Sequence, residues 1–284
     1  MANKTKEFLE PEHLRHFSLE GDPFFDLGDH RKIWLNGKLE KIKHLVCLTA
    51  RSQGIMVLTG DYGAGKSTML RHVLREMMTD GVTKIIMPDR LDRKALKGDM
   101  LTLAIIDQMG TPGMRVPSST VRRDKVVKEL LTKAIQRGEQ PLMVIDEAHD
   151  LQSGIFIALK RLWDSGLIFR NIGIVLAGAG GVDAKGIPWG LRWEIEGNPD
   201  LREFAERTRL VDMGRLADGL TDYLSWRFSS VGASLDAVFE ADALAILAER
   251  AQTAQLLGIL TVRSMREAYL DGATKVTVEH VLGA

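Results

Sequence analysis

Residues 55–68 read IMVLTGDYGAGKST, in which an apolar run of strand length leads directly into a glycine-rich loop and the start of a helical pattern. Residues 60–67 fit the pattern G-x-x-x-x-G-K-[ST], the Walker A motif or P-loop. Glycines let the backbone of such a loop curl so that successive N–H groups point inward, and the following helix adds partial positive charge at its N-terminus. The sequence therefore predicts a phosphate-binding loop between a strand and a helix.

The loop pattern assigns a chemical role to several of its residues. Lys66 is expected to reach the β- and γ-phosphates of a nucleoside triphosphate, and Ser67 to ligate Mg²⁺ through its hydroxyl. The alternative is an ordinary glycine-rich turn that caps a helix, and the strand-loop-helix setting disfavours it. ATP with Mg²⁺ is the expected cofactor. The residues expected to contact it are Gly60, Asp61, Tyr62, Gly63, Ala64, Gly65, Lys66, Ser67 and Thr68.

Two adjacent acids end another apolar run, residues 142–147, which read LMVIDE. Asp146 is expected to hold Mg²⁺ through water, and Glu147 to orient and activate the attacking water. Such acids are common at strand ends, but together with the phosphate loop they predict a Mg²⁺-dependent ATPase. The letters continue to DEAH through His149, yet nothing downstream resembles the remaining motifs of the helicases named for those letters.

Strand-like and helical patterns alternate through the first three quarters of the chain. The predicted strands are 55–59, 84–87, 142–145 and 172–177, with 209–213 as a possible addition, and the predicted helices between them are 66–78, 99–109, 119–137 and 154–164. Nearly continuous apolar strands between helices predict an α/β fold with a doubly wound parallel sheet.

The pattern is helical only from about residue 216, at 216–230, 236–252, 261–270 and 277–282. We therefore expect a lead-in segment at 1–35 that packs its aromatic side chains on the domain behind it, an α/β nucleotide-binding domain at 36–213 and a small helical lid domain at 214–284. Many P-loop ATPases place one strand between the loop strand and the acid-bearing strand, and 172–177 is expected there. Its end, with Ala179, lacks a polar side chain for the γ-phosphate, so this sensor is missing or comes from another segment.

The composition of the chain narrows the classes of protein to which it can belong. The 284 residues include 38 Lys and Arg against 38 Asp and Glu, which with 45% hydrophobic residues excludes disordered, collagen-like and coiled-coil chains. The single cysteine, Cys47, cannot form an intrachain disulfide, and the chain shows neither a signal peptide nor a membrane span, so we expect a cytoplasmic protein without a membrane partner. With zero formal charge, a DNA-binding surface has to come from local clustering of cations.

Positive charge gathers in two segments between the phosphate loop and the acidic strand. Residues 84–97 and 115–128 together hold ten basic and three acidic residues. Solvated helix faces are the alternative, since this is the usual place of charge runs. The candidate DNA-binding residues are Arg90, Arg93, Lys94, Lys97, Arg122 and Arg123.

Five motifs in order resemble the AAA+ ATPases of the ExeA, TnsC and MuB kind. They are the lead-in from His16 to Phe24, then GDYGAGKS, VIDEAHDL, LAGAG and LREFAERTRL. The resemblance implies an arginine that crosses a subunit interface to the neighbour's γ-phosphate, and the matching position is Arg207, with Arg209 as the competitor. A salt bridge of Arg207 with Glu203 or Glu206 is the alternative reading.

The resemblance also implies a second sensor and a biological role. Arg263 would contact the nucleotide from the lid side, unless it is a solvent-facing arginine at a helix start. The first basic cluster would line the channel of an ATP-dependent homo-oligomer, a ring or a helical filament, around double-stranded DNA of any sequence. Such a protein would serve transposition, a form of DNA recombination, by selecting target DNA and delivering it to a transposase, and hydrolysis would disassemble it.

Three other roles remain open within this fold. They are an ExeA-like ATPase of secretion, a nucleotide-gated signalling switch that hydrolyses slowly, and a helicase loader. The segment 183–198, with Trp189 and Trp193, is either an interface or a loop whose indoles fold back on the core.

Overall fold

The computed structural model describes residues 8–25, 33–88, 93–166, 170–214 and 219–284. Two compact units divide the chain. One consists of residues 37–61 and 66–213, and the other of the described parts of 1–36 and 214–284 together with 62–65.

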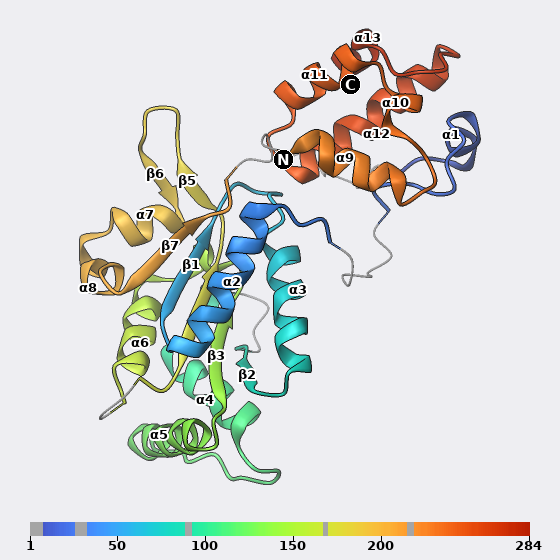
Figure 1. Cartoon of the computed structure of the whole chain (residues 1–284). Coiled ribbons are helices and arrows are strands. Elements are labelled where there is room, and N and C mark those ends of the chain that lie inside the picture. Colours follow the sequence, from blue (N-terminus) through green and yellow to red (C-terminus); the bar gives the residue numbers. More distant parts are fainter. Residues whose placement is uncertain (1–7, 26–32, 89–92, 167–169, 215–218) are drawn as a thin grey trace. The chain divides into compact units, whose positions relative to one another are not determined.

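The first unit is built on a five-stranded sheet in the order β2-β3-β4-β1-β7, in which every pairing is parallel (Figure 1). This is the predicted α/β architecture. The strand between β1 and β3 is β4, as expected for the run at 172–177. The bounds are β1 Ile55–Thr59, β2 Thr83–Ile86, β3 Gln140–Ile145, β4 Gly173–Ala177 and β7 Thr208–Asp212, and an antiparallel hairpin pairs β5 Gly180–Val182 with β6 Pro188–Gly190.

Seven α-helices and three short 3-10 helices of this unit surround the strands in the described residues. The α-helices are α2 Gly37–Ser52, α3 Lys66–Thr79, α4 Gly98–Met109, α5 Thr120–Gln136, α6 Ser153–Trp163, α7 Leu191–Glu196 and α8 Arg202–Ala205. The 3-10 helices are η1 Arg93–Ala95, η2 Ala148–Asp150 and η3 Pro199–Leu201. The predicted strand and helix positions of the α/β region are confirmed to within two residues at each end.

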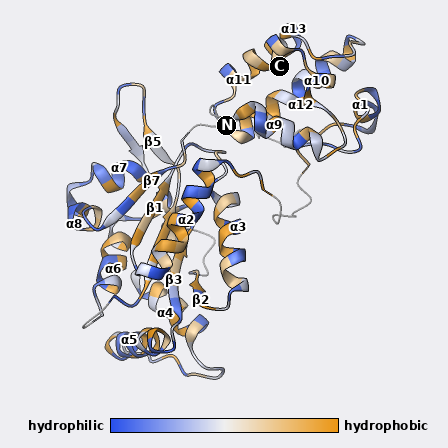
Figure 2. Ribbon diagram, viewed as in Figure 1, coloured by the Kyte–Doolittle hydropathy of each residue, from blue (hydrophilic) through white to orange (hydrophobic). Residues whose placement is uncertain are grey.

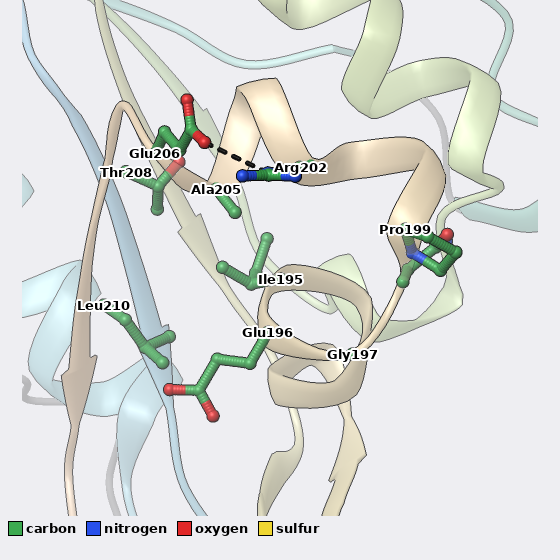
Figure 3. Close-up of a pocket in the computed structure, with 10 residues that line it drawn as sticks. Ile195, Glu196, Gly197, Pro199, Arg202, Ala205, Glu206, Thr208 and Leu210 are labelled. Carbon is green, nitrogen blue, oxygen red and sulfur yellow. Dashed lines mark hydrogen bonds and ion pairs between the residues drawn. The ribbon is translucent and has the colours of Figure 1, made fainter.

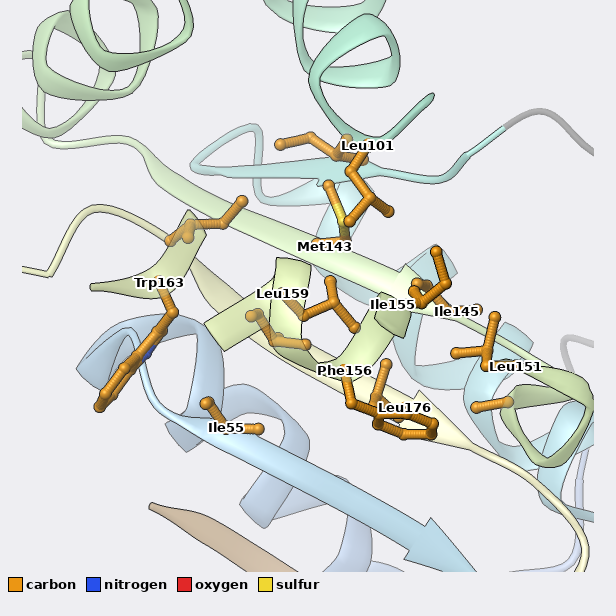
Figure 4. Close-up of a cluster of buried hydrophobic side chains, with 14 of the residues drawn as sticks. Ile55, Leu101, Met143, Ile145, Leu151, Ile155, Phe156, Leu159, Trp163 and Leu176 are labelled. Carbon is orange, nitrogen blue, oxygen red and sulfur yellow. The ribbon is translucent and has the colours of Figure 1, made fainter. Parts of the chain in front are cut away.

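The central strands are buried on both faces, which explains their nearly continuous apolar sequences. Side chains alternate between the two faces of a strand, so Ile55, Met143 and Leu176 all reach the same side. There they join Phe156 and Leu159 of α6 in one buried cluster (Figure 4). Figure 2 shows mainly apolar colour on the inner strands, while the helices around them carry both apolar and polar colour.

The register of the sheet brings three chain segments to one edge. Leu58 of β1 lies beside Ala177 of β4, and Ile145 of β3 lies beside Leu176. Because the strands are parallel, the segments that follow β1, β3 and β4 all leave the sheet on the same side. These are the phosphate loop, the acidic pair and the run from Gly178.

The second unit is helical. It contains α1 Pro11–His16, α9 Leu220–Ser229, α10 Leu235–Val238, α11 Ala241–Arg250, α12 Ala254–Leu270 and α13 Val278–Gly283. Phe17 and Leu19 of the lead-in are buried in one cluster with these helices, and His16 Nε2 lies 2.8 Å from the carbonyl oxygen of Ala273. The lead-in thus packs on the C-terminal helices. The expectation that it packs on the domain that follows it in sequence was wrong, because its apolar partners lie some 200 residues away along the chain.

Two helix predictions in this unit need correction. The helix expected at 261–270 begins at Ala254, and Gly258, expected as a break, lies inside it. There the absence of a side chain lets the ring of Phe24 approach closely. The helix expected at 236–252 is divided into α10 and α11, because Phe239 forms a parallel bridge with Val276 between them.

The close packing of α2 on β4 can be tested at Gly173. A Cβ at this position would lie 2.7 Å from the carbonyl oxygen of Thr49 in α2. We expect Gly173→Ala to lower the free energy of unfolding by about 1–3 kcal/mol, the usual cost of overpacking, as measured by urea denaturation. Gly154→Ala in α6 is the matched control, because a Cβ there meets no atom within 4 Å. Equal stability of the two variants would contradict the packing.

Candidate nucleotide-binding site

The loop that follows β1 has a backbone that only glycine adopts easily. Gly60, Gly63 and Gly65 have φ angles of 156°, 75° and 94°. A side chain at any of them would be strained, which explains the three glycines of the motif. The backbone therefore has the curled form that a phosphate-binding loop requires, and it leads into α3, whose first residue is Lys66.

The ammonium of Lys66 is buried in this loop, with only 9% of the residue exposed. Its Nζ donates to the carbonyl oxygens of Gly60 at 2.9 Å and Asp61 at 2.8 Å. Burial lowers the pKa of Lys66, and the carboxylates of Glu147 and Asp146 act in the opposite direction. An anion bound beside this desolvated ammonium would offset the cost of its burial, so the lysine suits a phosphate.

The acidic pair follows β3 at the same sheet edge. Glu147 has a left-handed backbone conformation, with φ 57° and ψ 37°, which is uncommon for a residue with a side chain. Its N–H donates to Oδ1 of Asp146 at 3.0 Å. Such strain occurs where the surroundings fix a conformation, and it often marks a functional site. The structure thus brings Lys66, Asp146 and Glu147 together.

The end of β4 has no polar side chain from Ala177 to Gly180, as the sequence showed. A histidine lies there instead. His149 Nδ1 accepts a hydrogen bond from the N–H of Ala179 at 3.2 Å and lies 3.4 Å from Oε2 of Glu147. The sequence analysis did not include His149 in the site, and its place one turn after the acids was the available signal.

Oxygen ligands suitable for Mg²⁺ lie on both sides of this edge. The Ser67 hydroxyl begins α3 and the Asp146 carboxylate follows β3, and both residues are half-buried. A hydroxyl and one carboxylate, completed by phosphate oxygens and water, match the preferences of Mg²⁺. These residues therefore fit the predicted cofactor.

Arg207 and Arg209 lie away from the phosphate loop of their own chain. Thr208 of β7 is beside Ile55, the first residue of β1, whereas the loop follows the last. At about 3.3 Å per residue, β1 separates Arg207 from Gly60 by about 17 Å, which exceeds the reach of an arginine side chain. The side chain of Arg207 therefore cannot reach a nucleotide at the phosphate loop of the same chain.

The ion pair of Arg207 differs from the alternative considered above. Its Nη1 donates to both carboxylate oxygens of Asp164, and its guanidinium lies 5.7 Å from the ring centre of the buried Trp163. Glu203 pairs with Lys160 and Glu206 with Arg202. Arg209 is exposed on the edge strand, with no hydrogen bond or ion pair to any residue that the structure describes.

Arg263 lies within α12, nine residues after its first residue, and not at a helix start. It is exposed, and its Nη1 donates to the carbonyl oxygen of Ala284 at 3.3 Å. The alternative was therefore wrong about the helix start, because the helix begins about two turns earlier than its apolar pattern indicated, and right that Arg263 is exposed.

The candidate DNA-binding residues differ in the exposure of their side chains and in the partners that they already have. Lys97 and Arg122 are exposed, Lys94 is exposed beside Asp150, and Arg123 is half-buried with Nη2 3.3 Å from the Thr120 hydroxyl. Arg93 instead donates to two backbone carbonyls inside its own unit. Arg90 lies outside the described residues.

A separate hollow of about 640 Å³ lies between β7, α7, η3 and α8 (Figure 3). Ile195 and Leu210 line it together with the ion-paired Arg202 and Glu206. Neither the phosphate loop nor the acidic pair Asp146 and Glu147 contributes to it, so it is distinct from the candidate site.

The segment 183–198 contains the turn of the β5–β6 hairpin, β6 and α7 instead of the expected loop. Trp189 is half-buried with its indole against Gly181, and Trp193 is 44% exposed. Among the described residues, no helix is both long enough and apolar enough to cross a bilayer.

Comparison with known proteins supports the fold. Residues 49–185 match the model of a family described as an AAA domain. Cdc6p from Pyrobaculum aerophilum has a TM-score of 0.54 at 19% identity over 84% of this chain and 62% of its own, so this chain spans less than two thirds of that protein. The ORC2 protein of Aeropyrum pernix, in ADPNP–ADP complexes, has a TM-score of 0.53 at 15% identity over 89% of this chain and 68% of its own.

The Aeropyrum pernix ORC1 protein in complex with DNA has a TM-score of 0.54 at 19% identity over 97% of this chain and 70% of its own. No curated protein sequence matches the chain significantly. The chain therefore has the α/β P-loop fold of AAA+ ATPases, while the specific ExeA, TnsC and MuB group is not distinguished by these similarities.

Removal of the Lys66 charge tests the nucleotide site. We expect Lys66→Met to weaken MgATP binding at least about 100-fold in calorimetric titration, because charge-assisted hydrogen bonds contribute about 1.5–3 kcal/mol each. Lys41→Met, at an exposed position of α2, should bind MgATP as the wild type does. Similar affinity of the two variants would refute the role of Lys66.

The lowered pKa of Lys66 also predicts a pH dependence of stability. Between that lowered pKa and the ordinary value of 10.5, the unfolded chain binds a proton that the folded chain has lost. The free energy of unfolding of the wild type, relative to Lys66→Met, should therefore increase as the pH rises through this window. Urea denaturation at neutral pH and near pH 10.5 measures it. A constant or decreasing difference would show that the folded pKa is not lowered.

Proposed function

We propose that this protein is a Mg²⁺-dependent ATPase that assembles on double-stranded DNA with ATP bound between neighbouring copies. The observation that carries the proposal is the separation of two sets of residues on one sheet. Lys66, Asp146 and Glu147 meet at the carboxyl edge, whereas Arg207 precedes the amino end of β7. A site of this kind is completed by a second copy.

Hydrolysis then follows from the residues at the carboxyl edge. Lys66 binds phosphate oxygens, while Ser67 and Asp146 hold Mg²⁺, which neutralises charge on the phosphates. The carboxylate of Glu147 orients a water and accepts its proton as the water attacks the γ-phosphorus, while the bond from this phosphorus to the β–γ bridging oxygen breaks and ADP leaves. Gly63 and the other loop residues supply backbone N–H donors.

An arginine of the neighbouring copy, Arg207 or Arg209, neutralises the remaining negative charge on the γ-phosphate. An arginine supplied in this way makes hydrolysis depend on assembly. Both arginines are exposed, but Arg207 has to exchange Asp164 for phosphate, whereas Arg209 has no ion pair among the described residues. Either choice predicts a closed ring or an open helical filament.

Binding of DNA is supported by the exposed cations Lys94, Lys97 and Arg122 and by the fold shared with an ORC1 protein solved in complex with DNA. Contacts to phosphates give affinity that depends on salt and little on sequence. A role in transposition, with target DNA delivered to a transposase, rests on the sequence motifs shared with TnsC- and MuB-like proteins. Arg263 as a second sensor has the same support.

A nucleotide-gated switch with slow hydrolysis is the second candidate. The end of β4 carries no polar side chain to contact a γ-phosphate, and this observation favours it. The variant Glu147→Gln distinguishes an ATPase from a slowly hydrolysing switch. An ATPase should lose about 10²–10⁴-fold in kcat and remain bound to duplex with ATP, since general-base catalysis contributes this much. A switch should hydrolyse ATP at nearly its wild-type rate after the same change.

Mixing of two inactive variants tests whether the site is shared. Glu147→Gln keeps the arginine, and Arg207→Ala or Arg209→Ala keeps the glutamate. The arginine variant alone should lose at least about 10³-fold in kcat if that arginine acts on the transferring phosphoryl group, and Glu147→Gln alone should show the loss given above. A one-to-one mixture should recover about one quarter of wild-type turnover, because one interface in four combines both intact residues.

The recovery identifies the arginine, since only the variant that lacks it is both inactive alone and complemented. Arg202→Ala, on the same stretch of chain and paired with Glu206, serves as the control and should keep wild-type turnover. Failure of every mixture to recover activity, with each variant folded and binding ATP, would show that the site is complete within one copy.

A further inference from the structure

We propose that Arg93 is a positioning residue for the acidic pair and not a contact to the DNA backbone. This inference rests on the proposed function, because it concerns the same hydrolytic site. Arg93 Nε donates to the carbonyl oxygen of Asp146 at 3.1 Å, and Nη1 donates to the carbonyl oxygen of Pro88 at 3.1 Å. Composition placed Arg93 in a basic cluster, but its guanidinium is directed to backbone within the unit.

The first of these hydrogen bonds has a particular target. The carbonyl of Asp146 belongs to the peptide group that joins Asp146 to Glu147. The N–H of the same peptide donates to Oδ1 of Asp146 at 3.0 Å. Both polar groups of this peptide are therefore engaged, one by Arg93 and one by Asp146 itself. The plane of the peptide is fixed, and with it the directions in which the two acidic side chains leave the backbone.

Fixing this peptide matters because Glu147 is in the left-handed region, with φ 57°. A residue with a side chain keeps such a conformation only when its surroundings hold it, since the strain costs of order 1–3 kcal/mol. Without Arg93, rotation of the peptide relieves the strain and moves the carboxylate of Glu147. Arg93 thereby acts on the reaction through the glutamate and touches no substrate itself.

Neighbouring contacts attach the whole η1 segment to the same loop. Gln152 Nε2 donates to the carbonyl oxygen of Lys94 at 3.2 Å, and Lys94 Nζ lies 3.6 Å from Oδ1 of Asp150. The Lys94 ion pair is exposed and contributes little energy. The two hydrogen bonds that Arg93 donates to carbonyl oxygens, by contrast, depend on the orientation of its guanidinium.

Arginine is required for this geometry. Its guanidinium presents Nε and Nη1 as fixed, coplanar donors, so it can hold two carbonyls in a set orientation, whereas lysine offers a single flexible ammonium. A phosphate contact does not need this geometry, because lysine can replace arginine there and retain the positive charge. Arg93→Lys and Arg93→Ala therefore distinguish the two roles.

Steady-state ATP hydrolysis and binding to random duplex at several salt concentrations provide the test. We expect both Arg93 variants to lose at least about tenfold in kcat while KM for ATP stays within about twofold, since binding by Lys66 is untouched. Duplex affinity of Arg93→Ala should keep the wild-type salt slope, whereas Lys97→Ala should reduce that slope by about 0.9. Arg75→Ala, an exposed arginine of α3, is the matched control and should keep wild-type kcat.

Three outcomes would overturn the inference. Unchanged kcat in both Arg93 variants, or a loss in Arg93→Ala that Lys fully restores together with a reduced salt slope, would overturn the inference and make Arg93 a phosphate contact. A kcat loss accompanied by loss of ATP binding and a lower melting temperature would also overturn it, as a general structural role. If the wild type itself does not hydrolyse ATP, the proposed function fails first.

Discussion

The parallel pairing of β3, β4 and β1 is the constraint on which the rest of this structure depends. It delivers the glycine-rich loop, the acidic pair and the end of β4 to one sheet edge, although they are separated by up to about 120 residues in sequence. Burial of these strands on both faces makes the register difficult to change, because a shift would move apolar side chains out of the core. The buried ammonium of Lys66 lies at this same edge.

Local signals in the sequence were sufficient for the loop and the strands. The glycines at 60, 63 and 65 occupy positive φ angles, and the continuous apolar runs are the strands that helices cover on both faces. The lead-in, by contrast, packs on C-terminal helices, and α12 continues through Gly258 because Phe24 packs there. These features depend on contacts between residues distant in sequence, which periodicity does not reveal.

The same limit applies to the candidate site. Composition placed Arg93 among DNA-binding cations, and only the structure shows its hydrogen bond to the carbonyl of Asp146. His149 at the end of β4 was likewise found only through the fold. At the opposite edge, Arg207 pairs with Asp164 and lies over Trp163, whose indole N–H donates to the carbonyl oxygen of Gln53. Acids nearer in sequence had seemed the natural partners, but they pair elsewhere.

A triphosphate site shared by two adjoining copies makes hydrolysis depend on assembly, and the mass of the assembly tests this sharing most directly. Sedimentation velocity of the purified protein should show a large, fast-sedimenting species only when magnesium, a slowly hydrolysed ATP analogue and random-sequence duplex are present together. Replacement of the analogue by ADP should return the protein to small species. A protein that stays monomeric with all three components at saturating concentration would contradict the central claim.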